Sequence, residues 1–300
     1  MRLILIHAAE IVSPTFKILQ MLDTHLKHTT ITNPISKTAY YSLGVRAWDA
    51  TLPRPACGDT FAKLFMNEDA QKMWQEFKAD LRPNASNASR HAIIDGQVAE
   101  ALLSQSYALV VIIGAGFDTR AFRMKGGRWI EVDEPAIIGY KETALPTVKA
   151  PNPLIRIPIE FSRESSIDGL SHFSTQTTTH IILEGVLMYL NQLDRRRLIT
   201  GLQEIFPHHI VYCDLMRRSF FERYSKEIHE KILSLGATFT DISEHPESLF
   251  LDNRYKPLSC VSIPLSAAEH GNLGIPFFLV RYFFKTLRKG YCNWRFEFRR

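Results

Sequence analysis

The residues best suited to binding a ligand form a glycine-rich turn directly after an apolar run. Six apolar residues, 108–113, end in Gly114-Ala115-Gly116. Glycines at such a turn let the backbone bend tightly, and they let a ligand approach because no Cβ is in the way. In an open α/β sheet this turn lies at the carboxyl end of a strand, where ligands bind. The segment therefore predicts a site for a nucleotide-like cofactor.

The residues after the glycines favour a cationic cofactor over a dinucleotide. A dinucleotide-binding turn has a third Gly or Ala where helix and strand pack closely, and Thr119 stands at that place. Asp118 would repel phosphates, whereas S-adenosylmethionine carries a sulfonium and an ammonium and no phosphate. We therefore expect S-adenosylmethionine as the cofactor.

A second acidic residue ends the next expected strand, 128–133. Asp133 lies 19 residues after Gly114. A carboxylate at the end of the second strand accepts hydrogen bonds from both ribose hydroxyls of an adenosine. The alternative is that Asp133 caps the helix starting at Pro135, because Asp-x-Pro is a common helix start. The glycine turn at the expected distance favours the ribose role.

A third acidic residue, Glu184, ends an apolar run that predicts a buried strand at 179–184. Almost nothing polar surrounds Glu184 in the sequence, and burying an unpaired carboxylate is unfavourable. Glu184 therefore requires a cationic partner, and we expect the cofactor ammonium to serve.

These three segments together resemble the leucine carboxyl methyltransferase family. The likeness rests on Gly-Ala-Gly-Phe-Asp-Thr-Arg, Val-Asp-Glu-Pro and Glu-Gly-Val-Leu-Met-Tyr-Leu in that order, and it runs from about residue 30 to the C-terminus. The stretch 281–291 is similar to the bacterial branch. The family comprises class I S-adenosylmethionine-dependent methyltransferases, including protein-phosphatase carboxyl methyltransferases and many bacterial small-molecule O-methyltransferases. The resemblance implies a Rossmann-like seven-stranded sheet.

The resemblance also implies two contacts to the methionine carboxylate of the cofactor. Family members hold it with a Lys of the N-terminal segment and an Arg of the helix before the first strand. Lys37 and Arg90 occupy these places, and a guanidinium suits a carboxylate. The alternatives are a solvated Lys37 and an ordinary Arg90 in a first helical turn. The helix dipole disfavours a cation there, which supports a functional reason for Arg90.

One departure from the family pattern concerns the adenine. Where the family has Asp-Leu at the end of the third strand, with the acid reaching the adenine amino group, this chain has Glu160-Phe161. We expect adenine binding to survive with a shifted geometry, while a weaker cofactor site or a changed substrate pocket stays open. The candidate cofactor-binding residues are Lys37, Arg90, Gly114, Ala115, Gly116, Asp133, Glu134, Glu160, Phe161 and Glu184.

Tyr189 is the candidate catalytic residue near the transferred methyl group, with a packing role as the alternative. A carboxylate acceptor is ionised at neutral pH and needs no general base, whereas a hydroxyl acceptor needs one. No motif places a histidine for that role, and the four cysteines show no metal-ligand spacing. We expect no metal site.

The order of apolar runs predicts an α/β fold of one domain, 1–300. Alternating strands and helices indicate a parallel sheet, with an antiparallel edge from two late strands. Residues 1–105 form a helical N-terminal cap, with 83–89 as a loop, and 106–300 form the Rossmann-like core. A helical insertion at 216–256, broken at Gly236, follows the fifth strand as a lid. The expected elements are strands 108–114, 128–133, 154–161, 179–184, 209–215, 256–264 and 290–298, and helices 136–145 and 192–206.

Composition restricts the partners and the compartment. The net charge of +5 over 300 residues is modest, so we expect no nucleic-acid partner. Basic and aromatic residues alternate within 281–300; they form either a surface for an anionic partner or, as we favour, a solvated helix and edge hairpin. The chain has no apolar run of about 18 residues, so we expect no membrane partner. Scattered cysteines fit a reducing, cytoplasmic location.

The sequence therefore predicts an S-adenosylmethionine-dependent O-methyltransferase that acts on a carboxylate or hydroxyl of a small molecule. A carboxyl methyltransferase of a protein C-terminus is one alternative. A catalytically silent protein that binds the cofactor or a partner is another, because fold does not fix function. An NAD-dependent oxidoreductase is less favoured because the third glycine is missing.

Overall fold

One seven-stranded sheet forms the centre of the computed structural model, which describes residues 31–161, 167–240 and 242–300. The strand order is β3-β2-β1-β4-β5-β7-β6, and β7 runs antiparallel to both of its neighbours. The predicted α/β class and antiparallel edge are confirmed. The strands are β1 (Leu109–Ile113), β2 (Arg128–Asp133), β3 (Leu154–Pro158), β4 (Thr179–Leu183), β5 (His208–Met216), β6 (Lys256–Ser262) and β7 (Tyr291–Arg299).

The central strand β1 shows why the apolar runs fold as they do. Every residue of β1 is buried, and its side chains alternate between two cores. Val110 and Ile112 pack on the side covered by α5 (Leu81–Ser104), whereas Val111 packs on the side covered by α8 (Gln192–Ile205). Because β1 pairs in parallel with β2 and β4, all three strands end at the same edge of the sheet.

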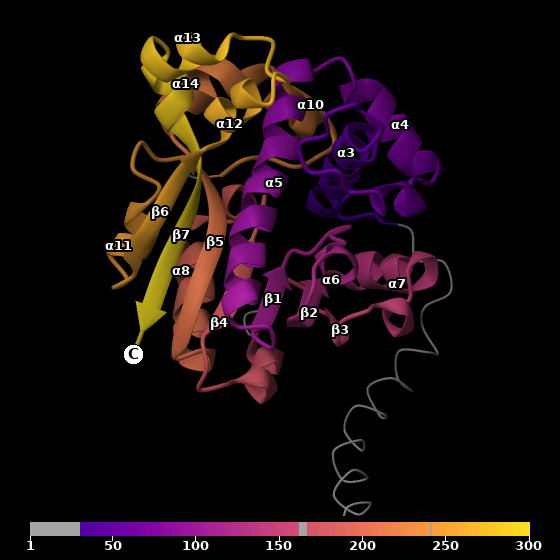
Figure 1. Ribbon diagram of the computed structural model, residues 1–300, viewed down its shortest axis with the longest axis vertical. Coiled ribbons are helices and arrows are strands. Elements are labelled where there is room, and N and C mark those ends of the chain that lie inside the picture. Colours follow the sequence, from indigo (N-terminus) through magenta and orange to yellow (C-terminus); the bar gives the residue numbers. More distant parts are fainter. Residues whose placement is uncertain (1–30, 162–166, 241) are drawn as a thin grey trace, which may run out of the picture.

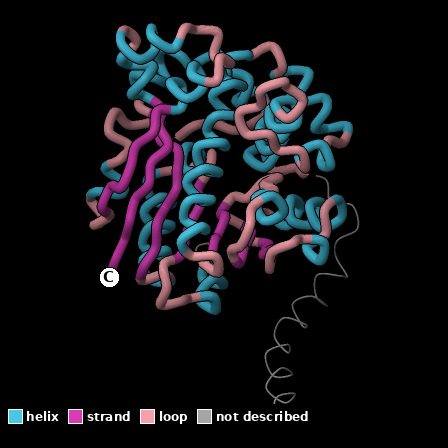
Figure 2. The backbone as a smooth tube through the Cα atoms, viewed as in Figure 1, coloured by secondary structure: helices cyan, strands magenta, loops and turns pink. Residues whose placement is uncertain are grey.

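Helices gather above that edge, where Figures 1 and 2 show α3, α10 and the α12–α14 group over the strand ends. Asn33 starts α3 by accepting hydrogen bonds from the amides of residues 35 and 36. Between β5 and β6 lies a mainly helical segment, as expected. The remaining α-helices are α3 (Pro34–Asp49), α4 (Glu68–Phe77), α6 (Arg120–Arg123), α7 (Pro135–Ala144), α9 (Arg218–Phe220), α10 (Lys226–Ser234), α11 (Ser248–Leu251), α12 (Ile263–Glu269), α13 (Phe277–Tyr282) and α14 (Lys285–Gly290).

The prediction of a loop at 83–89 is wrong, because this segment belongs to α5. Pro83 lies in the first turn, where a missing amide hydrogen does no harm. The small polar residues that suggested a loop are buried instead: the Asn84 side chain donates to the Phe77 carbonyl and that of Asn87 to the Ser42 hydroxyl. Arg90 therefore lies in the middle of a helix, and the dipole argument made for it does not apply.

None of the helices in the described parts of the chain combines the length and apolar character needed to cross a membrane.

Candidate cofactor site

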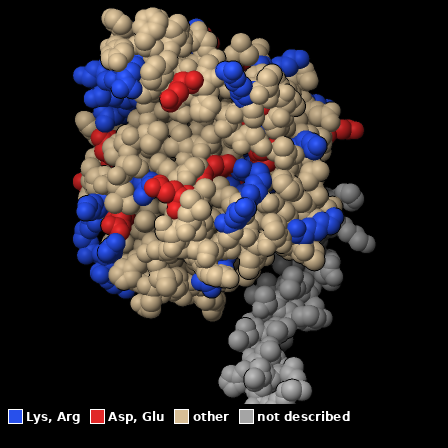
Figure 3. Space-filling model, in the orientation of Figure 1, with Lys and Arg blue, Asp and Glu red and all other residues tan. Residues whose placement is uncertain are grey.

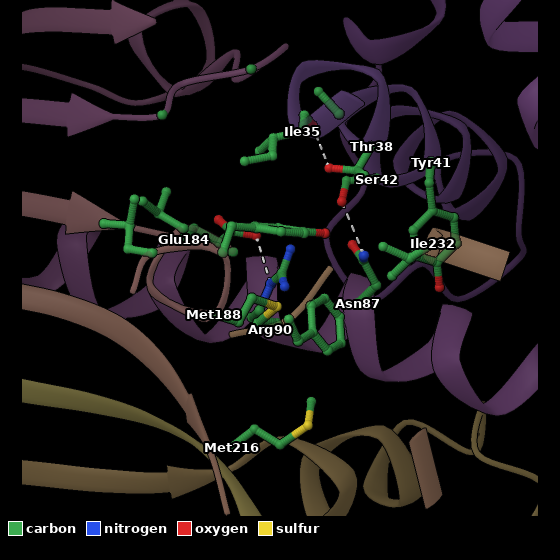
Figure 4. Close-up of a pocket in the computed structure, with 18 of the residues that line it drawn as sticks. Ile35, Thr38, Tyr41, Ser42, Asn87, Arg90, Glu184, Met188, Met216 and Ile232 are labelled. Carbon is green, nitrogen blue, oxygen red and sulfur yellow. Dashed lines mark hydrogen bonds and ion pairs between the residues drawn. The ribbon is translucent and has the colours of Figure 1, made fainter. Parts of the chain in front are cut away.

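A cavity of about 1310 Å³ opens above the carboxyl ends of the strands. It exceeds the roughly 300–1,000 Å³ of a usual ligand pocket, so it has room for a cofactor and a second molecule. Figure 4 shows part of its wall. The predicted residues that line it are Arg90, Gly114, Ala115, Gly116, Asp133, Glu134, Phe161, Glu184 and Tyr189.

Two predicted cofactor residues are not part of this lining. Lys37 is half-buried on α3, and Glu160 is exposed after β3. Phe161 does supply an apolar wall, and its amide donates to a carboxylate oxygen of Glu134 at 3.2 Å. The contacts of Lys37 and Glu160 with the cofactor thus stay predictions, because neither residue lines the cavity.

The glycine turn requires its glycines for both conformation and space. Gly114 and Gly116 have φ of +68° and +47°, which residues with a Cβ rarely adopt. A Cβ on Gly114 would lie 2.5 Å from Cγ2 of Val186. The amides of Gly114 and Ala115 donate to the Val132 carbonyl at 2.9 and 3.0 Å, so the turn is fixed to the end of β2.

Residues from the N-terminal helices hold the turn from outside. The Phe117 ring stacks on Tyr40 with centroids 5.1 Å apart and is 1% exposed. Arg46 donates to the Phe117 carbonyl at 2.9 Å and pairs with Asp59 at 2.6 Å. The sequence did not identify Arg46 or Asp59, because nothing local links them to Phe117, which lies 71 positions after Arg46.

Asp133 is a buried acid that is held by backbone groups. Its two carboxylate oxygens accept from the amides of Gly116, at 2.6 Å, and Glu134, at 2.7 Å. The N-cap residue of α7 is Glu134, so Asp133 does not cap that helix. Burial raises the pKa of Asp133 to about 6, although the two amide hydrogen bonds lower it. The Asp133 side chain forms no ion pair with any described residue, so its remaining lone pairs are available to the cavity.

Glu184 has the cationic partner it requires, but the protein supplies it. One Glu184 oxygen lies 2.7 Å from Nη2 of Arg120, and the other lies 3.2 Å from Nε of Arg90. Glu184 therefore does not need a cofactor ammonium to balance its charge, and its contact with the cofactor stays a prediction. Burial raises the pKa of Glu184, but His91 and Arg120 outweigh it and hold this pKa well below its usual value.

Arg120 is the centre of a buried charge cluster. Its side chain is fully buried and pairs with Asp95 and Asp118 as well as Glu184. Acidic and imidazole ligand atoms of His91, Asp118 and Glu184 lie within 4.8 Å of one another, and the guanidinium already contacts all three residues. Arg120 compensates the charge of Asp118, so this carboxylate does not provide the expected repulsion of phosphates.

Arg90 presents part of its guanidinium to the cavity. Nη1 lies 3.3 Å from a carboxylate oxygen of Asp214 and donates to the Tyr291 hydroxyl at 3.1 Å. Nη2 has no hydrogen-bond partner among the described residues. Figure 4 shows Arg90 and Glu184 joined at the same wall of the cavity. The sequence missed Asp214 and Tyr291, which position Arg90 from strands β5 and β7.

The turn after β4 approaches Arg90 closely. Gly185 has a φ of +67°, and a Cβ there would lie 3.1 Å from Nη2 of Arg90. Its amide donates to Asp214 at 2.6 Å. Gly185 thus leaves the space into which the Arg90 amino group projects.

Tyr189 ends a short 3₁₀ turn, Leu187–Tyr189, and lines the cavity. Its ring packs edge-on against Phe239 with centroids 5.4 Å apart. Burial raises the pKa of Tyr189. The phenol therefore stays protonated at neutral pH and can donate a hydrogen bond, but it cannot serve as a base.

Comparison with known proteins gives relatives in sequence. A family model described as leucine carboxyl methyltransferase matches residues 39–203, more than half of the chain. A candidate S-adenosyl-L-methionine-dependent methyltransferase of Streptomyces coelicolor is 26% identical over 55% of this chain and 52% of its own length. A Mycobacteroides abscessus protein of the same description is 25% identical over 53% of this chain and 58% of its own. The matched part thus spans little more than half of these relatives.

Solved structures show the same fold at low sequence identity. A candidate methyltransferase of Thermobifida fusca superposes with a TM-score of 0.56 and 13% identity, covering 83% of this chain and 96% of that one. A DUF574 family protein of Streptomyces avermitilis superposes with a TM-score of 0.51 and 10% identity, covering 86% of this chain and 97% of that one. At such identities the likeness concerns the fold alone.

Proposed function

This chain belongs to the leucine carboxyl methyltransferase family, and we propose that it transfers a methyl group from S-adenosylmethionine to an oxygen of a small molecule. One observation carries the proposal: the glycine turn, the uncompensated Asp133 and a free amino group of Arg90 line a single cavity. The names of its relatives also support methyl transfer.

The residues present fit this cofactor. Asp133 has acceptor capacity for ribose hydroxyls, because its hydrogen bonds to the protein use one lone pair of each oxygen. Phe161 offers an apolar wall for the adenine. Nη2 of Arg90, which projects past Gly185, can donate to the methionine carboxylate.

When bound, the cofactor supplies an electrophilic methyl group on a sulfonium. The chain would contribute mainly by positioning, since holding nucleophile and methyl in line is worth roughly 7–11 kcal/mol of the barrier. Tyr189 is placed to orient the acceptor by donating a hydrogen bond, because its phenol stays protonated. The helices above the sheet would help to exclude water once the cofactor and acceptor fill the cavity, which would strengthen these fixed interactions.

We infer that the oxygen nucleophile is a carboxylate rather than a hydroxyl. A hydroxyl requires a base, and neither of the two predicted residues nearest the expected methyl position can supply one: Tyr189 is protonated, and Glu184 is engaged by Arg120 and Arg90. A carboxylate is already ionised at neutral pH and needs none. A small-molecule hydroxyl remains the second candidate, and a protein C-terminus the third.

The wall beyond Arg90 points to an acceptor with an apolar body. Met188, Met216 and Ile232 line this part, as Figure 4 shows. A polar pair also lies in this wall, in which the Asn87 amide donates to the Ser42 hydroxyl at 3.1 Å. The Ser42 hydroxyl is half-buried and is oriented by this hydrogen bond, so it can donate to an oxygen of the acceptor.

The test is methyl transfer from isotopically labelled S-adenosylmethionine to a panel of apolar carboxylic acids and their matched phenols. The account predicts a labelled methyl ester that base hydrolyses. Ser42→Ala should raise the KM for an acceptor that carries a hydrogen-bonding oxygen by about tenfold. The dissociation constant of S-adenosylhomocysteine should not change in this variant. Labelled ethers in place of esters would contradict the carboxylate assignment.

A further inference from the structure

Helix α13 and the two residues that join it to α14 carry aromatic side chains that are exposed to solvent. Figure 1 shows these helices at an outer corner of the molecule. The aromatic face consists of Phe278, Tyr282, Phe283 and Phe284, which are 55%, 71%, 70% and 38% exposed. Single exposed apolar residues are ordinary in proteins, but a contiguous group marks an interaction surface. None of the four lines the cavity, so the face has no place in the proposed methyl transfer.

The aromatic face cannot be turned inward, because the other side of the same helices is already packed. Val280 is fully buried and Leu287 is 6% exposed, and both belong to one apolar cluster with the α12 residues Ile263 and Ala267. Helix α13 is therefore amphipathic: Val280 fixes it to the fold, and its other side carries two of the exposed rings. Leu287 fixes α14 in the same way, and the exposed side of α14 carries Lys285 and Lys289.

Cations surround the aromatic face without being neutralised. Arg281, Lys285 and Lys289 are exposed, and none of them pairs with an acid among the described residues. The sequence has five Lys or Arg and no Asp or Glu between Glu269 and Glu297. Figure 3 shows blue side chains gathered at the upper left, where Figure 1 places α14.

We propose that the aromatic face and its cations dock the protein onto an anionic lipid surface. Aromatic rings settle at the boundary between headgroups and acyl chains, and adjacent Lys and Arg attract anionic headgroups. The sequence alone favoured a solvated helix and hairpin here and no membrane partner. The exposure of the rings reverses that preference, because a solvated surface would hide them.

The position of the α12–α14 group supports a lipid over other anionic partners. Its inner side lines the cavity through Leu273, Ile275 and Leu287. A docked lipid surface would therefore lie next to the chamber for an apolar acceptor; this one argument rests on the proposed function. Single-stranded nucleic acid instead favours a basic groove whose rings stack on successive bases, and the aromatic face lies at an outer corner.

The test is co-sedimentation of the full chain with vesicles. We expect the protein to pellet with vesicles of equal parts phosphatidylserine and phosphatidylcholine, to stay in solution with phosphatidylcholine alone, and to be released by salt. Lys285→Glu with Lys289→Glu should weaken vesicle binding at least about tenfold. Tyr282→Ser with Phe283→Ser should weaken it several-fold.

Matched controls alter equally exposed residues elsewhere. Lys63→Glu with Lys149→Glu matches the charge change, and Leu103→Ser with Tyr107→Ser, at residues 89% and 83% exposed, matches the apolar change. Both controls should bind vesicles like the unaltered protein. All variants should bind S-adenosylhomocysteine equally, which shows that they are folded and separates this test from that of the proposed function.

Several results would overturn the proposal. They are failure to pellet with the anionic vesicles, equal binding to vesicles of phosphatidylcholine alone, and an equal loss in the control variants. Tighter binding to polyuridylate than to anionic vesicles would reassign the surface to nucleic acid. Self-association that Tyr282→Ser with Phe283→Ser abolishes would reassign it to a second copy of the chain.

Discussion

Two acids at neighbouring strand ends, Asp133 after β2 and Glu184 after β4, are held in opposite ways. Asp133 accepts two backbone amide hydrogen bonds and has a pKa raised to about 6 by burial. Glu184 pairs with Arg120 and Arg90, and its pKa is held well below the usual value. A strand-end position therefore does not by itself make an acid a ligand-binding group. Charge compensation decides, because only the acid that the protein leaves uncompensated has capacity for a ligand.

The cavity wall therefore has one part that can bind the cofactor and another part that holds the site in its folded shape. The binding part is the glycine turn with Asp133. The supporting part is the Arg120 cluster, which connects α5, the glycine turn and β4 through Asp95, Asp118 and Glu184. Loss of one partner from such a cluster leaves a buried charge unpaired, which destabilises a protein far more than loss of a surface pair.

The largest expected effect comes from removing the shared cation with Arg120→Met. Three acids lose a partner, so the free energy of unfolding should fall by about 3–5 kcal/mol or more and the Tm by about 10 °C. Differential scanning calorimetry would measure it, with Arg128→Met, at an exposed arginine, as the control. A Tm equal to that of the control would show that the cluster does not support the site.

The second-largest effect is expected on cofactor affinity when Asp133, the acid without an ion-pair partner, is altered. Asp133→Asn should weaken the binding of S-adenosylhomocysteine by about 10–100-fold, because hydrogen bonds to a charged acceptor are worth about 1.5–3 kcal/mol. The Tm at neutral pH should change little. Because the pKa of Asp133 is raised, its ionised form destabilises the folded state at neutral pH, and Asn removes this penalty. That gain offsets the loss of a hydrogen bond from a backbone amide. Isothermal titration calorimetry is the measurement, and Asp69→Asn, at an exposed acid of α4, is the control. Unchanged affinity would remove Asp133 from the site.

The pH dependence of binding should follow Asp133 and not Glu184. The ionised form of Asp133 accepts the ribose hydrogen bonds, so affinity should fall as the pH drops through about 6, where the carboxylate takes up a proton. Glu184 stays ionised over this range because its pKa is lowered. Titrations between about pH 5 and pH 8 would show the slope. A slope of the same size in Asp133→Asn would assign it to another group.

The smallest effect is expected at Glu160, the family's adenine-contacting position. Glu160 is exposed and outside the cavity lining, so Glu160→Gln should change the affinity for S-adenosylhomocysteine less than about threefold. The same titration measures it. A loss as large as that of Asp133→Asn would mean that Glu160 reaches the adenine when the cofactor binds, as the family pattern implies.

The sequence predicted the sheet well because its signals are local. Runs such as 109–113 and 181–183 are apolar and short, and all seven strands lie within a few residues of the expected ranges. The segment 83–89 misled the prediction, since small polar residues are typical of loops. Here they pack inside α5, where Asn84 and Asn87 find partners on other segments.

The site was predictable where its residues share one segment and not where distant segments meet. The glycine turn and Asp133 line the cavity as expected. The pairing of Glu184 with Arg120 was not foreseen, although Arg120 stands in the quoted motif, because the contact spans 64 positions. An arginine that follows a buried turn was the available signal, since a buried guanidinium requires acids around it.

The most direct test of this account is calorimetric titration of the unaltered protein with S-adenosylhomocysteine, with NADH as the control. The account predicts micromolar binding of S-adenosylhomocysteine and none of NADH. Binding of NADH alone would assign the glycine turn to a dinucleotide. Binding of neither would contradict the claim that the glycine turn, Asp133 and Arg90 form a cofactor site.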